Sequence, residues 1–343
     1  MNLSGLLGNF SNATLAHQPE NSSHWKPFPI AVLVIICLGA VLNILVLLTF
    51  LKSGAIRTPF NIYLVNLLIT NLLHVVLIKP LEVASNVLGG WTLGYSACTY
   101  FLYALYIINA EMIHAHALIS INRIWAVTFP ISYKYRHTKV TAIAICVANW
   151  IYVNALLLPQ IIRDAVWYRE LQITPFCFLH VKPQYSLIVF TEFWCYVVPA
   201  VVIAGAFPYV MCKRRKRTIA FVTEEPNPEI ATVGSIKVSL RSGHKGTIRP
   251  GGPNDTPSEL RTSGPQRSSG YMIFTALTVT VLVCWIPNIV FFKMNLLVEY
   301  YDTTVYEIVA SLFMLQAVTD PVFFIISLKD IRANIRKIFC LSV

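Results

Sequence analysis

Long apolar stretches separated by short polar connectors dominate this sequence. About 20 apolar residues span a bilayer as an α-helix, because every backbone N–H and C=O group is then satisfied inside the segment. Seven stretches reach this length, and their approximate bounds are 28–51, 60–88, 96–126, 140–162, 185–212, 270–294 and 304–327. The pattern predicts an all-α membrane protein built as a bundle of seven transmembrane helices.

The polar remainder divides the chain further. Residues 213–269 open with a run of Lys and Arg and continue through Pro, Gly, Ser and Thr, which predicts a disordered basic cytoplasmic loop between helices one to five (28–212) and helices six and seven (270–327). In the tail, 328–343, apolar and basic residues recur at helical spacing and predict a short amphipathic helix at the C-terminus. The residues on its two faces are Leu328, Ile331, Ile335, Ile338 and Phe339 against Lys329, Arg332, Arg336 and Lys337. Cys340 is a palmitoylation candidate, and a free thiol is the equal alternative.

The composition excludes several classes of protein. The chain is 56% apolar and only 13% charged, whereas ordinary globular proteins carry roughly 25% charged residues. Most Lys and Arg residues fall in gaps between apolar runs and not on one folded face, so we expect no nucleic-acid partner despite the net charge of +11. The eight Cys residues show no metal-binding spacing. We therefore expect no structural metal and no cofactor.

The distribution of basic residues predicts the orientation in the membrane. With the N-terminus outside, the inner segments hold 20 Lys and Arg residues and the outer segments hold four. This excess of positive charge on one side indicates the cytoplasmic side. Residues 1–27 also contain four N-glycosylation sequons, at Asn2, Asn9, Asn12 and Asn21. We expect a multi-pass plasma membrane protein with an extracellular, glycosylated N-terminus.

Short motifs follow one another in a fixed order along the spans. They are Gly39-Ala-Val-Leu-Asn43, Asn66-Leu-Leu-Ile-Thr-Asn71, Trp91-Thr-Leu-Gly94, Cys98, Asn122-Arg123-Ile124, Ala126-Val-Thr-Phe-Pro130, Trp150, Pro199, Cys284-Trp285-Ile-Pro287 and Asp320-Pro321-Val-Phe-Phe324. This ordered set, which covers about residues 28–340, resembles the pattern of rhodopsin-like (class A) G-protein-coupled receptors. Each motif is weak alone, but the order of the whole set is highly specific.

The resemblance implies a receptor and not an enzyme. Such a receptor binds an extracellular ligand, a small molecule or a peptide, in the outer half of the bundle and activates a heterotrimeric G protein on the cytoplasmic side. Arrestin and membrane lipids are the further partners that the resemblance implies. Two alternatives stay open: an atypical receptor that binds ligand without conventional coupling, and a membrane transporter or channel.

The resemblance also implies a disulfide. Cys98 lies at the outer start of the third span and Cys177 lies in the outer loop 163–184. Both residues are in the oxidising compartment, so we expect a bond that pins this loop over the bundle. Two free thiols are the alternative.

Ionisable residues inside the spans are the first candidates for a ligand site. Each costs about 2.5–3.5 kcal/mol at the bilayer centre, so such side chains face the bundle interior and are functional candidates. Those toward the outer half are Lys79, Glu82, Glu192, Lys293 and Glu307, and we add Leu105, Asn109 and Trp285 as further candidate ligand contacts. Four of these ionisable residues, all except Glu192, lie near helix ends. There, snorkelling to the membrane surface or pairing with each other is at least as good an explanation as contact with a ligand.

Two positions narrow the class of ligand. Leu105 stands seven residues after Cys98, where amine receptors of this family have the Asp that pairs with the ligand ammonium group. Met314 stands where opsins have the Lys that forms the retinal Schiff base. A typical amine receptor is therefore disfavoured and a photoreceptor is excluded. Glu192 could replace the missing Asp, which leaves an amine or a basic peptide open.

The third span also carries an acidic residue and two histidines. His114 and His116 are two residues apart, so they point about 200° apart on a helix and cannot bind one metal ion together. Glu111 shares a face only with His114. We interpret Glu111 and His114 as a hydrogen-bonded polar pair and not as catalytic or metal-binding residues.

The residues expected to act in activation and coupling depart from the family pattern. They are Asn71, Asn122, Arg123, Asp320, Pro321 and Phe324. Asn71 and Asp320 have exchanged the usual carboxylate and amide, which leaves open whether a sodium ion binds between the helices. Asn122 and Arg267 replace the two acidic residues that restrain the family's Arg. The family's two tyrosines that turn toward this Arg in the active state are Phe207 and Phe324 here, which lack the hydroxyl group. The Phe that acts as a switch in the family's sixth span is Val281.

Overall fold

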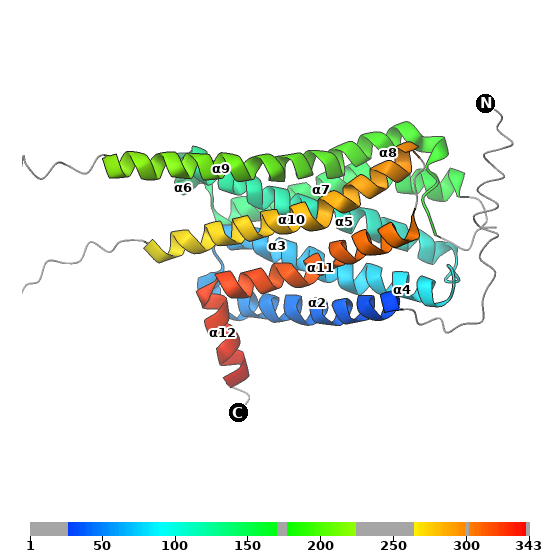
Figure 1. Cartoon of the computed structure of the whole chain (residues 1–343), viewed down its shortest axis with the longest axis horizontal. Helices are drawn as coiled ribbons and strands as arrows, with labels where there is room; N and C mark the ends of the chain where they lie inside the picture. Colours follow the sequence, from blue (N-terminus) through cyan, green and yellow to red (C-terminus); the bar gives the residue numbers. More distant parts are fainter. Residues whose placement is uncertain (1–26, 170–176, 224–263, 299–301, 341–343) are drawn as a thin grey trace, which may run out of the picture.

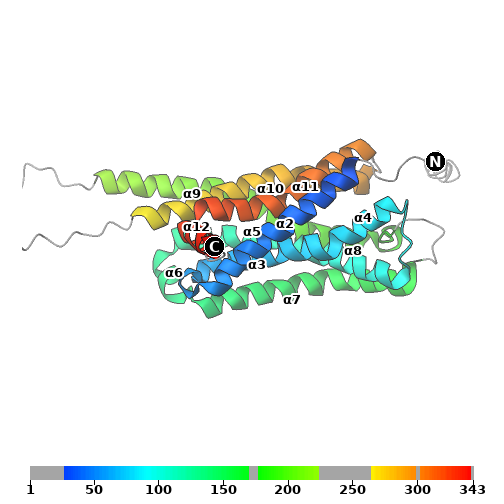
Figure 2. The same cartoon turned by 90° about the horizontal axis from the view of Figure 1, so that it is seen from below.

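The computed structural model describes residues 27–169, 177–223, 264–298 and 302–340, and Figures 1 and 2 show a bundle of long helices running side by side. Seven helices or helix runs in this part of the chain are long and apolar enough to cross a membrane. The predicted fold class is therefore confirmed. The predicted glycosylation sites at Asn2, Asn9, Asn12 and Asn21 lie outside the described residues.

The helices follow the predicted spans closely. Their bounds are α2 (Pro27–Lys52), α3 (Pro59–Leu73), α4 (Lys79–Val87), α5 (Tyr95–Thr128), α6 (Pro130–Arg136), α7 (Lys139–Arg163), α8 (Tyr185–Glu192), α9 (Val198–Thr223), α10 (Gly264–Val298), α11 (Thr303–Ser327) and α12 (Lys329–Cys340). Threonine side chains cap the starts of α3 and α7, where Thr58 and Thr138 accept backbone N–H groups. Asp302 caps α11 in the same way, at 2.9 Å from the Val305 nitrogen.

The predicted loop 213–269 is wrong at both of its edges. Helix α9 continues to Thr223, and α10 begins at Gly264. The sequence after Cys212 contains good helix formers and no Pro or Gly until Pro226, so nothing ends the helix at the membrane boundary. The sequence-based boundary followed the loss of hydrophobicity, and a helix can continue past that point as long as its polar face is solvated.

Two of the spans contain an internal turn of π-helix, and a third span, Lys139–Tyr168, ends in one at Asp164–Tyr168. One internal turn covers His74–Ile78 between α3 and α4, and the other covers Phe193–Val197 between α8 and α9. Each lies immediately before a proline-containing helix start, at Pro80 and Pro199. Proline lacks an N–H group and clashes with the preceding turn, so the wider π turn relieves the contact without breaking the span.

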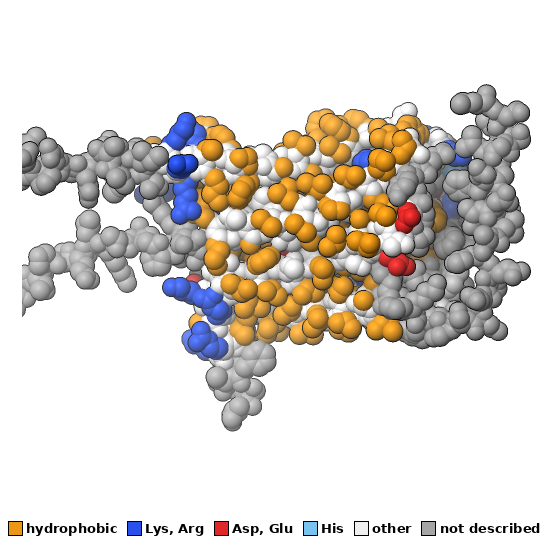
Figure 3. Space-filling view, in the orientation of Figure 1, with side chains coloured by type: hydrophobic (Ala, Val, Ile, Leu, Met, Phe, Trp, Pro, Cys, Tyr) orange, Lys and Arg blue, Asp and Glu red, His pale blue; other side chains and the backbone are white. Residues whose placement is uncertain are grey.

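The side chains follow the environment of a bilayer. Figure 3 shows apolar side chains over the middle of one face, with Lys and Arg gathered at one end and acidic side chains toward the other. Many of the exposed residues are large and apolar, for example Val41, Leu51 and Ile151, each more than 60% exposed. A water-soluble surface would not expose so many. The chain is therefore a multi-pass membrane protein.

Helix α12 turns away from the bundle at the end of α11 (Figure 1). Ile331 is fully buried, and Leu328 and Ile335 pack against the main core. The basic residues Arg336 and Lys337 are exposed. The predicted amphipathic helix is therefore confirmed. Below, the end of the bundle that holds α12 and Arg123 is called the basic end, and the end that holds Cys98 and Cys177 is called the disulfide end.

Helices α2 and α11 approach each other closely at Gly39. The Asn43 amide donates to the carbonyl oxygens of Gly39 and Ala317, both at 2.7 Å, and so joins the two helices. A Cβ atom on Gly39 would lie 3.3 Å from Cγ1 of Val75 and 3.5 Å from Cβ of Ala317. The small residue is thus required by packing.

We expect Gly39→Leu to lower the free energy of unfolding by about 1–3 kcal/mol, because the added side chain overpacks this contact. The matched control is Gly205→Leu, since a Cβ atom at Gly205 meets nothing within 4 Å. The midpoint of thermal unfolding in detergent measures both. Equal midpoints for the two variants would show that the Gly39 contact is not tight in solution.

Candidate functional site

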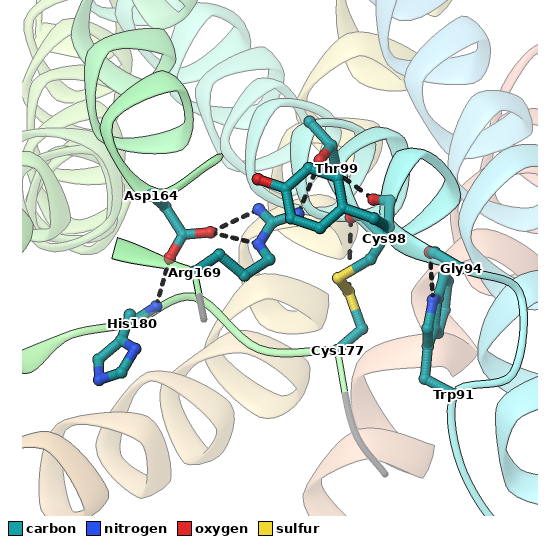
Figure 4. The surroundings of a disulfide bond; sticks show 9 residues. Trp91, Gly94, Cys98, Thr99, Asp164, Arg169, Cys177 and His180 are labelled. Atoms are coloured by element: carbon teal, nitrogen blue, oxygen red, sulfur yellow. Dashed lines mark hydrogen bonds and ion pairs between the residues drawn. A yellow bond between two sulfur atoms is a disulfide. The ribbon is translucent and has the colours of Figure 1, made fainter. Parts of the chain in front are cut away.

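The disulfide end is closed by a covalent bond between α5 and a loop segment. The sulfur atoms of Cys98 and Cys177 are bonded, with a Cα–Cα distance of 5.6 Å. The predicted disulfide is therefore confirmed. Just before α5, the Trp91 indole donates to the Gly94 carbonyl at 3.0 Å, and Gly94 has a φ of 84° that favours glycine (Figure 4). This turn sets the position at which α5, and with it Cys98, begins.

A second anchor of the same segment is Asp164, which is fully buried at the end of α7. Its carboxylate accepts from the Arg169 Nε at 2.7 Å and from the His180 backbone N–H at 2.7 Å (Figure 4). Arg169 in turn donates to Thr99 of α5 at 2.7 Å. The carboxylate therefore ties together two parts of the chain on either side of residues 170–176. We call Thr99, Asp164, Arg169 and His180 the loop latch.

Four of the predicted ligand contacts form two ion pairs near the disulfide end. Lys79 Nζ lies 2.6 Å from Glu82 Oε2, within one turn of α4, and Tyr306 of α11 approaches Glu82 at 3.5 Å. Glu192, at the end of α8, pairs with Lys293 of α10, and their side chains are 19% and 23% exposed. These four side chains therefore pair with one another, which was the alternative to contact with a ligand. Each Lys balances one Glu.

The remaining candidates differ in their surroundings. Leu105 is partly buried among apolar residues, and Glu307 is half-buried with no ion pair among the described residues. Trp285 is buried, and its ring lies edge-on to Phe313 with the ring centroids 4.7 Å apart. The Trp285 Nε1 and the Asn109 Oδ1 are both buried without a hydrogen-bond partner in the described part of the chain.

Asp320 joins three helices in the middle of the bundle. Its Oδ2 atom accepts from the Asn71 amide of α3 at 3.0 Å and lies 3.3 Å from the His116 Nε2 of α5. Gln316, one turn earlier on α11, also contacts His116. The side chains of His116 and Asp320 are almost completely buried. The exchanged carboxylate and amide therefore still meet, and a histidine joins them.

The two histidines of α5 point to opposite sides, as their spacing predicts. Whereas His116 faces α11, the His114 Nδ1 lies 3.1 Å from the Asn149 Oδ1 of α7. The Asn149 amide donates to Glu111 at 2.7 Å. Glu111 and His114 are thus joined through Asn149 and not by a direct hydrogen bond, which corrects the predicted pair. In the described residues, no group of three or more His, Cys, Asp and Glu side chains could hold a metal ion.

At the basic end, the Arg123 guanidinium lies over the Phe60 ring, 3.6 Å from its centroid. No carboxylate in the described ranges pairs with Arg123. The neighbouring Asn122 is hydrogen-bonded to Tyr133 and His137. Burial and the positive charge of Arg123 lower the pKa of His137 to about 4. The imidazole is therefore neutral at cellular pH.

The other predicted activation residues lie in the helices as expected. Phe324 and Val281 are buried in the main core, and Pro321 lies within α11. Phe207 faces Phe274 with the ring centroids 6.1 Å apart, so aromatic packing is retained without hydroxyl groups. Arg267 and Cys340 lie within α10 and α12, but their side chains are outside the described residues.

The residues of the site that sequence reasoning missed carry no local pattern that predicts their partners. Asp164 is a single acidic residue at the end of a span, and Arg169 follows at a spacing that no helix periodicity indicates. His137 and Gln316 carry no motif. A signal existed only for Asp164, because a carboxylate within an apolar stretch requires a partner.

The fold and these features define a seven-helix membrane receptor. A model of the family "7 transmembrane receptor (rhodopsin family)" matches residues 42–324. The chain therefore belongs to the rhodopsin family of seven-transmembrane receptors. It is a G-protein-coupled receptor by family and not an enzyme.

Individual relatives are more distant. The chain is 29% identical to the mouse (Mus musculus) 5-hydroxytryptamine receptor 1B over 159 residues, which are 46% of this chain and 41% of that receptor. It is 28% identical to the goldfish (Carassius auratus) alpha-2 adrenergic receptor over 171 residues, or 46% of this chain and 39% of that receptor. The match thus spans about two fifths of the length of these relatives.

We expect Asp164→Asn to lower the free energy of unfolding by about 3–5 kcal/mol, because it leaves the buried Arg169 cation without its counter-charge. Asp302→Asn is the matched control, since an exposed N-cap asparagine serves as well as an aspartate. Thermal unfolding in detergent and the amount of protein at the cell surface report the effect. If the two variants behave alike, the loop latch contributes nothing to the fold.

Proposed function

We propose that this receptor binds an extracellular ligand at the disulfide end and activates a heterotrimeric G protein at the basic end. The observation that carries the proposal is the contrast between the two ends. One end has a loop segment held by a disulfide and a buried carboxylate, and an acid–base pair that joins α8 to α10. The other end presents Arg123, α12 and a row of exposed basic residues.

The ligand site of the proposal is centred on the Glu192–Lys293 pair. A ligand that carries only an ammonium group would have to displace Lys293, which already balances Glu192. Leu105 offers such a ligand no second carboxylate. Although two relatives are named as 5-hydroxytryptamine and adrenergic receptors, these residues favour a ligand with both an acidic and a basic group, such as a peptide. The free polar atoms of Asn109 and Trp285 would add hydrogen bonds.

A screen of peptides and amines on expressing cells, with G-protein and arrestin readouts, tests this site. Glu192→Gln and Lys293→Met should each weaken the response to an active compound, and the double variant should lose less than the sum because the pair is shared. A compound whose potency is unchanged in all three variants binds elsewhere.

The orientation of the proposal rests on charge. Basic residues gather at the end that carries α12 (Figure 3), and such residues mark the cytoplasmic side of membrane proteins. The disulfide requires an oxidising compartment at the opposite end. Both arguments support the proposal that the N-terminus lies outside the cell at the plasma membrane.

We expect glycosidase treatment of intact cells to increase the gel mobility of the full chain. The control is a variant in which Gln replaces Asn2, Asn9, Asn12 and Asn21, and glycosidase should not change the gel mobility of this variant. An epitope at the C-terminus should be stained only after permeabilisation. Staining of that epitope on intact cells would overturn the orientation.

Coupling by this receptor should include measurable ligand-free activity. Arg123 has no carboxylate partner among the described residues, and Arg267 stands where the family has an acidic residue. Repulsion between two cations near solvent is about 1 kcal/mol or less, which still changes a two-state ratio up to about fivefold. The inactive state is therefore less favoured than in a receptor with an arginine–carboxylate lock.

We expect Arg267→Glu to lower ligand-free nucleotide exchange on a co-expressed G protein at matched surface expression. Arg267→Gln removes the repulsion without adding an attraction, so it should have an intermediate effect. The exchange rate in isolated membranes is the measurement. A parent receptor without basal exchange, or one unchanged by both substitutions, would favour the alternative of a receptor that does not couple.

A further inference from the structure

The amide of Asn122 stands where the family has a carboxylate, and both of its ends are engaged. Asn122 is only 3% exposed. The Tyr133 hydroxyl donates to its Oδ1 at 3.1 Å, and its Nδ2 lies 2.9 Å from the Nε2 of His137. The two partners come from α6 and from the residue that follows α6. The pair therefore joins α5 to this short helix.

The imidazole of His137 is held by aromatic rings from three helices. It stacks on Tyr133 of α6 with the ring centroids 4.3 Å apart and on Tyr63 of α3 at 5.8 Å. Trp125 of α5 meets it edge-on at 5.7 Å. These contacts surround the ring, whose Nε2 faces Asn122.

The chemistry of the contact requires a neutral imidazole. The Asn122 Nδ2 can only donate, so the facing nitrogen of His137 must accept, and an imidazolium has no acceptor. The groups that face His137 are Asn122, Tyr133, Tyr63, Trp125 and the cation of Arg123. No carboxylate in the described ranges pairs with it. The surroundings thus contain nothing that would favour a second positive charge.

We propose that neutral His137 is a positioning residue for G-protein coupling, which ties α6 to α3 and α5 through Asn122 and so restrains the ligand-free state. The inference rests on the proposed function, because coupling is what the restraint controls. In this proposal the restraint on the resting state acts on Asn122 and not on the neighbouring Arg123. Arg123 then needs no carboxylate in the resting state and lies on the Phe60 ring.

The charge state of His137 is tested by NMR on the full chain in nanodiscs, with histidine labelled at the ring. His137→Phe identifies the signal of this ring by its loss. The parent signal should stay that of a neutral ring from pH 8 to about pH 5. In Asn122→Asp a carboxylate faces the ring and favours the imidazolium, so the transition should move toward neutral pH.

The restraint itself is tested by ligand-free nucleotide exchange at matched expression. Tyr133→Phe removes the hydroxyl that binds Asn122 and should raise exchange about threefold to tenfold, as expected for loss of one buried hydrogen bond from the resting state. Tyr135→Phe is the matched control on the same helix, because Tyr135 is 74% exposed. In Asn122→Asp, exchange relative to the parent should fall between pH 7.5 and 5.5, because the imidazolium then pairs with the new carboxylate.

Three results would overturn the proposal: a charged His137 in the parent at pH 7, equal exchange in Tyr133→Phe and Tyr135→Phe, or a pH-independent ratio in Asn122→Asp. Absence of exchange in every variant would overturn the proposed function instead. In that case the NMR transition of Asn122→Asp, and the thermal unfolding of Tyr133→Phe against Tyr135→Phe, still decide whether His137 holds α6.

Discussion

The structure depends on the hydrogen bonds that buried polar side chains make with one another inside an apolar layer. No water is available in the bilayer core, so each polar atom there is satisfied by another helix or is left unpaired at a large cost. Asp320 is the central case, because it meets Asn71 and His116 and so fixes α11 relative to α3 and α5. Asn43 fixes α2 to α11 in the same way. Apolar packing alone would let these helices rotate or slide against one another.

This constraint explains how the chain tolerates its departures from the family pattern. The exchange between positions 71 and 320 keeps one carboxylate and one amide in contact, so the interhelical bond survives. Asn122 loses a negative charge, but Tyr133 and His137 satisfy its amide. In both places the hydrogen bonds are kept, while the negative charge moves from one helix to another at positions 71 and 320 and is lost at Asn122. These departures therefore change the electrostatic balance between the resting and active states more than they change the fold.

The sequence predicted the bundle well because the spans are long and each is constrained separately by the thickness of the bilayer. It also predicted the opposite directions of His114 and His116, which follow from helix geometry alone. By contrast, the partner of a given polar residue depends on how the helices pack. Asp164 bonds to the His180 backbone 16 positions away, and His116 meets Asp320 more than 200 positions away. The stack around His137 depends on the orientation of aromatic rings. No local pattern carries this information.

The two internal π-helical turns, His74–Ile78 and Phe193–Val197, change the phase of the helices that follow them. An α-helix advances about 100° per residue, so the extra residue in each wide turn rotates every later side chain by about that angle relative to an uninterrupted helix. Glu192 precedes one such turn and Pro199 follows it. Counting seven residues between them therefore does not place Glu192 two regular turns away on the same face. Any alignment of this chain with a receptor that lacks the extra residue must shift by one position there, and a ligand-contact residue transferred without that shift would be assigned to the wrong side of the helix.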